Sequence, residues 1–67
     1  MRPPAADLEA IKARYGDVPR VATAKNAGQL VDLIVRHELF RSPKLSYATA
    51  MKQILDADPA LRELYAR

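Results

Sequence analysis

"SYATAMKQILDADPALRELY", residues 46–65, predicts two short helices joined by one sharp corner. Ser46 is a favourable N-cap for the first helix, because its hydroxyl can accept a hydrogen bond from a free backbone N–H of the first turn. Asp58 and Pro59 mark the corner, since the aspartate can cap a second helix whose first position suits proline. The predicted helices span residues 47–56 and 59–66.

Both predicted helices have one apolar face, which can pack on a neighbouring element. Apolar residues recur at the i, i+3 and i+4 spacing that places side chains on one side of a helix. In the first helix these are Tyr47, Met51, Ile54 and Leu55, and in the second they are Leu61, Leu64 and Tyr65. The small residues Ala48 and Ala50 allow another helix to approach closely.

Residues 27–41 predict the longest and most apolar helix. Asn26 can cap it, with Gln29 in capping-box spacing, and Thr23 is an earlier candidate for the cap. Apolar residues cover much of its circumference: Leu30, Val31, Leu33, Ile34, Val35, Leu39 and Phe40. Two interpretations stay open, because such a helix is either the centre of the core or also part of an interface with a partner.

The polar strip that remains on this helix carries Asp32 and Arg36 at i, i+4 spacing, so the two side chains can pair. After the helix, Pro43 interrupts the chain and pushes Ser42 out of helical geometry. The break separates this helix from the two that follow.

A first helix is predicted at residues 4–15, where Pro3 and Pro4 suit a helix start. Gly16 is expected to end this helix and Pro19 to prevent its continuation. The next residues predict a loop that touches the core through Val18 and Val21, and a short strand there would have no partner strand. The fold class predicted is all-α, a bundle of three to four short helices in one domain covering residues 1–67.

The length of 67 residues limits the core that the chain can form. A domain of this size buries only about 60% of its unfolded surface, so we expect a stability of roughly 3–8 kcal/mol. The chain has no cysteine, which excludes disulfides and thiolate metal sites. Small domains without such staples often oligomerise or dock on a larger protein, so a homo-oligomer or a subunit of an assembly is expected. No uncharged run is long enough to cross a bilayer and no signal peptide is evident, so no membrane association is expected.

The residues present do not favour catalysis. His37 is the only histidine, and it lies in the middle of an apolar helix without an evident nucleophile or orienting group. Asp56 and Asp58 are best explained as residues that end and cap helices. Gly16 and Gly28 lack the spacing of a phosphate-binding loop. We therefore expect no enzyme activity, no metal and no cofactor.

The net charge of +3 permits contact with nucleic acid. The helical pair at residues 46–65 superficially suits a helix-turn-helix unit, but its second helix begins with "DPAL" and offers only Arg62 as an early donor. Non-specific contact through the basic middle of the chain is the better candidate. Its residues would be Lys12, Arg14, Arg20, Lys25, Arg36, Arg41, Lys44 and Lys52. The same charges are also typical of a solvated face that keeps a small apolar protein soluble.

The pattern Ser46-Tyr47, Ala50-Met51, Ile54-Leu55, Asp58-Pro59, Leu61 and Tyr65 resembles a short helix–DP–helix motif of bacteriophage and prophage proteins. Such motifs occur in small phage products and near the ends of head-morphogenesis proteins. The resemblance covers residues 46–65 alone and implies a viral or prophage origin, with the host cytoplasm or the virion as the place of action. It implies no particular activity.

The function expected from the sequence is therefore non-enzymatic docking of an apolar helical surface on a protein partner. That partner is another copy of the chain, a virion component or a host protein. The residues expected to make the contact are Leu33, Phe40, Tyr47 and Tyr65. The alternative is a small regulatory protein that binds nucleic acid through the basic region from Lys12 to Lys52.

Overall fold

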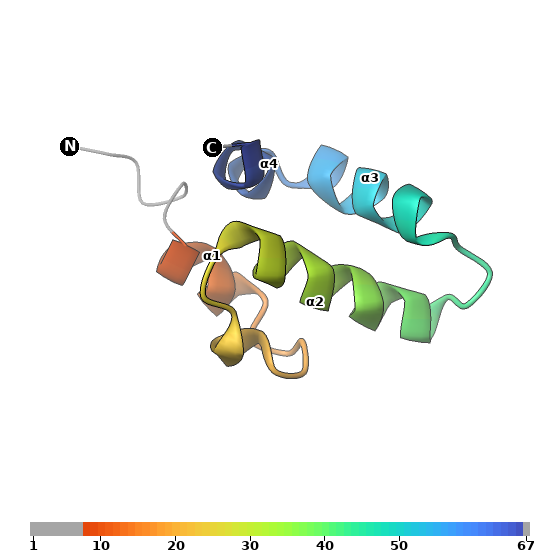
Figure 1. Ribbon diagram of the computed structural model, residues 1–67, viewed down its shortest axis with the longest axis horizontal. Coiled ribbons are helices and arrows are strands. Elements are labelled where there is room, and N and C mark those ends of the chain that lie inside the picture. Colours follow the sequence, from red (N-terminus) through yellow and green to blue (C-terminus); the bar gives the residue numbers. More distant parts are fainter. Residues whose placement is uncertain (1–7, 67) are drawn as a thin grey trace.

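The computed structural model of the protein describes residues 8–66, which form four α-helices and one short 3-10 helix with no strand among them (Figure 1). The all-α prediction is confirmed. The elements are α1 (Leu8–Arg14), the 3-10 helix η2 (Val21–Thr23), α2 (Ala27–Arg41), α3 (Tyr47–Ala57) and α4 (Pro59–Ala66).

Helix α2 is the central element of the bundle. It packs against α3, α4 and η2, while α1 packs against α4. In Figure 1, α2 and α3 run antiparallel as a hairpin, and α1 and η2 lie beside the first part of α2. The far end of the hairpin extends beyond the other helices, so the last part of α2 has fewer neighbours than the first.

The hydrophobic core follows this arrangement. Its buried members are Ile11, Val18, Val21, Ala24, Leu30, Val31, Ile34, Val35, Ala50 and Leu61. All four buried residues of α2 lie between Leu30 and Val35, whereas Leu39 is half-buried and Phe40 is exposed. The core is therefore concentrated around the first part of α2, where α1, η2 and α4 meet it.

The predicted caps explain why the helices begin where they do. The side chain of Asn26 accepts a 2.9 Å hydrogen bond from the backbone N–H of Gln29, and Ser46 accepts one of 3.1 Å from that of Thr49. The Gln29 side chain accepts a 2.8 Å bond from the backbone of Lys25, one residue earlier than in a standard capping box. Thr23 is not a cap, because its hydroxyl donates to the carbonyl of Arg20.

The predicted helix at residues 4–15 is seen as α1, which ends at Arg14; its expected start at Pro3 and Pro4 lies outside the described residues. The helix ends before Gly16, as predicted, although Gly16 does not adopt the left-handed conformation. A turn closes the helix instead, with the backbone N–H of Val18 bonded to the carbonyl of Tyr15 at 2.9 Å.

The segment between α1 and α2 contacts the core as predicted. Val18 and Val21 are both buried, and the chain around Val21 forms the 3-10 helix η2, which the sequence pattern did not indicate. Arg20 precedes η2 with φ of 65°, in the left-handed region. This segment covers one side of α2 and brings Pro19 and Arg20 next to its exposed surface.

Candidate interaction surface

Phe40 is the most exposed large apolar residue in the described part of the chain. It is 86% exposed although it lies within the regular helix α2, one residue before the C-terminal Arg41. Leu33, two helical turns earlier on the same side, is half-buried. The core therefore leaves one apolar side of α2 partly uncovered, as expected if α2 has more apolar circumference than its neighbours can bury.

A shallow depression of about 350 Å³ lies on this side of α2. We call its lining residues the Phe40 face: Pro19, Arg20, Leu33, Arg36, His37 and Phe40. Pro19 and Arg20 come from the segment before η2, and the other four are neighbours on one side of α2. The Phe40 face includes two arginines and no carboxylate.

Asp32 connects the Phe40 face to α3. Its Oδ1 accepts a 2.7 Å hydrogen bond from the Tyr47 hydroxyl, and its Oδ2 accepts one of 2.9 Å from Nε of Arg36. The hydrogen bond from Tyr47 is the main reason that the pKa of Asp32 lies below its ordinary value, and the same bond raises the pKa of Tyr47. Tyr47 thus has its hydroxyl hydrogen-bonded within the chain, while the residue as a whole remains 41% exposed.

Of the four residues predicted to bind a partner, Phe40 belongs to one row of α2 residues and the other three lie beside that row. Gly28, Asp32, Arg36 and Phe40 follow at i, i+4 spacing and therefore lie along one side of the helix. Tyr65 lines a depression with Gly28, Tyr47 bonds to Asp32, and Leu33 lines the Phe40 face. Leu33 and Phe40 line the same depression near the end of the row. Tyr47 and Tyr65 lie beside its earlier part.

Lys12 is occupied within the fold. Its ammonium group donates to the carbonyls of Ala22 at 3.2 Å and Ala24 at 2.9 Å, and it lies 3.5 Å from the carboxylate of Glu9. The Lys12 side chain is only 14% exposed. Lys12 fastens the end of η2 to α1. These contacts explain its position without a phosphate partner.

Three more of the eight basic residues form ion pairs: Arg14 with Asp58, Arg36 with Asp32, and Lys52 with Asp56. The remaining four, Arg20, Lys25, Arg41 and Lys44, are exposed and form no ion pair with any residue from 8 to 66. Lys25 precedes α2 and Lys44 follows it, and the 15 residues of α2 span about 22 Å. The cations without ion pairs are therefore spread along the molecule.

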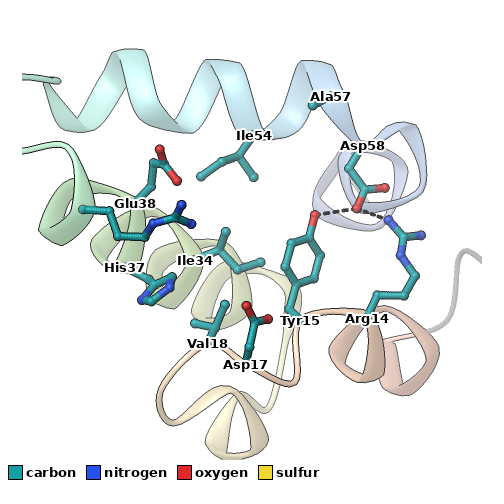
Figure 2. Close-up of a pocket in the computed structure, with 11 residues that line it drawn as sticks. Arg14, Tyr15, Asp17, Val18, Ile34, His37, Glu38, Ile54, Ala57 and Asp58 are labelled. Carbon is teal, nitrogen blue, oxygen red and sulfur yellow. Dashed lines mark hydrogen bonds and ion pairs between the residues drawn. The ribbon is translucent and has the colours of Figure 1, made fainter.

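Asp58 is the only buried charged residue of the described chain, with 5% exposure. Its Oδ1 caps α4 by accepting a 3.2 Å bond from the backbone N–H of Leu61, as the sequence predicts. Its Oδ2 accepts a 2.6 Å bond from the Tyr15 hydroxyl and an ion-paired bond from Arg14, both at the end of α1 (Figure 2). Asp58 therefore also joins the corner between α3 and α4 to α1, which the sequence pattern did not reveal.

The electrostatics of this cluster follow from its hydrogen bonds. Burial alone would raise the pKa of Asp58, but the bonds from Tyr15, Arg14 and the Leu61 backbone outweigh it and hold the pKa below its ordinary value. Burial and the bond to Asp58 raise the pKa of Tyr15 to about 12. The carboxylate is thus ionised and the phenol neutral at neutral pH, as the geometry requires.

A hollow of about 390 Å³ lies beside this cluster, between α1, α2 and α3 (Figure 2). His37 and Asp58 both line it, but the Asp58 carboxylate is already bonded to Arg14, Tyr15 and Leu61. The His37 side chain makes no hydrogen bond with another residue from 8 to 66. Within the same range, no group of histidine, cysteine, aspartate or glutamate side chains could hold a metal ion.

The second predicted helix-ending residue, Asp56, lies inside α3 and pairs with Lys52 at 2.9 Å instead of capping a helix.

Comparison with protein-family models, with curated proteins and with solved structures gives no match for this chain. None of the helices formed by the described residues is long and apolar enough to cross a membrane. The geometry of the described residues therefore carries the functional argument by itself. Its most distinctive surface feature is the Phe40 face.

Proposed function

We propose that the protein is a non-enzymatic interaction module that docks the Phe40 face of α2 on a protein partner. The observation that carries the proposal is the 86% exposure of Phe40 on a helix whose other side forms the core. Burying a phenylalanine side chain contributes about 2 kcal/mol, which this chain does not obtain alone. Aromatic residues in such positions are frequent anchors of protein interfaces.

The size of the chain supports docking. A small core without disulfides gains stability when a partner covers its remaining apolar surface. The resemblance of residues 46–65 to a phage motif supports a virion component or a host protein as the partner, with the host cytoplasm or the virion as the place of action. Self-association through the same face is the remaining form of the proposal, and light scattering over a dilution series tests it.

Site-specific crosslinking tests the proposed function. A photoreactive phenylalanine analogue at position 40 should crosslink to a defined protein in the source cell, whereas the same analogue at the exposed position Gln53 of α3 should not. The crosslinked protein is then purified, and Phe40→Ser should weaken its binding about tenfold or more without changing the fold. Equal crosslinking from positions 40 and 53, or unchanged affinity of the variant, would overturn the proposal.

A second candidate function is non-specific binding of nucleic acid. It is favoured by Arg20, Lys25, Arg41 and Lys44, which are exposed and form no ion pair within the described chain. A gel shift at low and moderate salt tests it, because phosphate contacts give binding that falls steeply with salt. Absence of a shift at low salt eliminates this candidate.

A further inference from the structure

We infer that the segment docking on the Phe40 face is an acidic amphipathic helix of a different protein, with an aliphatic or aromatic side chain in the depression and carboxylates on the two arginines. This inference rests on the proposed function and names the chemistry of its partner. The lining of the Phe40 face, the bonding of Arg36 and the charges that a second copy would bring support it.

The lining of the Phe40 face combines an apolar centre with a cationic rim. Leu33, Phe40 and Pro19 offer apolar surface, and the depression of about 350 Å³ is large enough for one inserted side chain. Arg20 and Arg36 contribute positive charge, and no aspartate or glutamate lines the depression. A complementary segment therefore needs an apolar anchor flanked by negative charge.

One of the two arginines, Arg36, is positioned before any partner arrives. Arg36 is bonded through Nε to Asp32, and Asp32 is itself held by the Tyr47 hydroxyl. The two terminal nitrogens of Arg36 have no hydrogen-bond acceptor among residues 8–66. Arg20 is restrained only in its backbone, which follows Pro19 and adopts φ of 65°, and its side chain is exposed. A guanidinium whose orientation is already restricted loses less conformational freedom when it binds a carboxylate through two parallel hydrogen bonds.

A second copy of the chain is a poor occupant of the same face. A closed two-fold dimer brings identical patches together, so it would oppose Arg20 and Arg36 of each chain to the same residues of the other. Asp32 compensates Arg36, but among residues 8–66 no carboxylate lines the Phe40 face or pairs with Arg20, so the two Arg20 side chains would remain opposed. The net charge of +3 opposes self-association further.

Nucleic acid fits the face less well than an acidic helix does. A strand needs a continuous track of cations along its phosphates. Here Arg36 already shares its charge with Asp32, and Lys25 and Lys44 lie beyond opposite ends of α2. One apolar depression lined by two arginines instead suits one apolar anchor with acidic flanking residues on a helix.

Three synthetic helical peptides test the inference. They share the same leucine and phenylalanine positions and carry glutamate, glutamine or lysine at the positions flanking them. Nuclear magnetic resonance titration of the isotope-labelled protein gives both the affinity and the place of binding. The glutamate peptide should bind about tenfold more tightly than the glutamine peptide, and added salt should reduce this difference. The shifted resonances should include those of Leu33, Arg36 and Phe40.

Matched variants locate the charge effect. Arg36→Gln and Arg20→Gly should each weaken binding of the glutamate peptide about fivefold. Glycine suits the left-handed backbone at position 20, so a loss of binding there cannot be attributed to unfolding. Arg62→Gln on α4 is the control, since Arg62 is exposed and outside the Phe40 face, and it should leave the affinity unchanged.

Each outcome decides. Equal or tighter binding of the glutamine or lysine peptide, binding at another surface, or no binding of any peptide overturns the acidic partner. Displacement of the glutamate peptide from the Phe40 face by a single-stranded oligothymidine of higher affinity overturns it in favour of nucleic acid. Charge-independent binding at the Phe40 face would leave the proposed docking function standing, whereas failure of the crosslink at position 40 would remove that function itself.

Discussion

The hydroxyl of Tyr15 donates a 2.6 Å hydrogen bond to Oδ2 of Asp58, a residue 43 positions further along the chain. Together with the ion pair from Arg14 to the same carboxylate, it fastens the end of α1 to the corner between α3 and α4. The Asp58 carboxylate also caps α4. One buried side chain thus serves a local and a long-range purpose.

Replacing members of this cluster should lower stability to different extents. Tyr15→Phe should reduce the free energy of unfolding by about 1 kcal/mol, because Asp58 keeps its other partners. Asp58→Ala should cost about 3 kcal/mol, since it removes the α4 cap and leaves Arg14 and Tyr15 without their acceptor. Urea unfolding followed by circular dichroism measures both. Asp56→Ala is the control and should change little, so an equal loss from both aspartates would contradict the role of Asp58.

Stability should decline at both extremes of pH. Asp58 has a folded-state pKa below its ordinary 3.8, so its contribution is present above pH 3.8 and is lost as the pH falls through the lower folded value. Tyr15 has a folded-state pKa raised from 10.0 to about 12, so its contribution is complete below pH 10 and is lost as the pH rises to about 12. Unfolding measured across pH should show a flatter acid limb in Asp58→Asn and a flatter alkaline limb in Tyr15→Phe. Unchanged limbs would show that these groups do not control the pH dependence.

Lys12→Met should destabilise the protein by about 1–2 kcal/mol, although the residue is a lysine on a small basic protein. The substitution keeps the aliphatic stem but loses the bonds from the ammonium group to the carbonyls of Ala22 and Ala24. Lys25→Met, at an exposed position without an ion pair in the described chain, should have little effect. Equal urea midpoints for the two variants would show that the Lys12 bonds contribute nothing to stability.

Arg20→Gly should stabilise the protein by about 0.5–1 kcal/mol, because glycine adopts φ of 65° without the strain of a side chain. Gly16→Ala should also be tolerated or mildly stabilising, since no glycine of the described chain has positive φ and a Cβ there would lie 3.5 Å from its nearest neighbour. Thermal unfolding of both variants checks the pair. A lower midpoint for Arg20→Gly would mean that the arginine side chain stabilises the fold.

Phe40→Ser should leave the free energy of unfolding within about 0.5 kcal/mol of the original, because the side chain is 86% exposed. Leu61→Ala, which removes a fully buried side chain from the core, should cost about 2–4 kcal/mol. Leu33→Ala should lie between them. Urea unfolding ranks the three, and a large loss from Phe40→Ser would place that residue in the core and remove it from the docking surface.

Local sequence signals were sufficient to predict the four α-helices, although not the 3-10 helix η2. Asn26, Ser46 and the pair Asp58-Pro59 act within a few residues of their own position, and the starts of α2, α3 and α4 agree with them. The end of α1 was predicted to within one residue, but the positive φ of Arg20 was not predicted. An arginine gives no sequence signal for that conformation, because the surrounding fold imposes it.

Long-range contacts could not be predicted in the same way. Nothing in the spacing of Arg14, Tyr15 and Asp58 indicates that they meet, because their contact depends on how α1 packs against the corner before α4. For the same reason Lys12 was grouped with the surface cations. Periodicity did indicate that Leu33 and Phe40 extend the apolar surface of α2: Phe40 is exposed, whereas Leu33 is half-buried and packs against the core.

The unequal coverage of α2 also makes the molecule extensible. The buried residues of α2 end at Val35, while the chain from Phe40 through the turn before Tyr47 contributes nothing that is fully buried. Seven-residue segments could therefore be added to both α2 and α3 at the free end of their hairpin. Such segments would preserve the sides on which the two helices face each other. The fold would then act as a fixed base that carries a helical arm of adjustable reach.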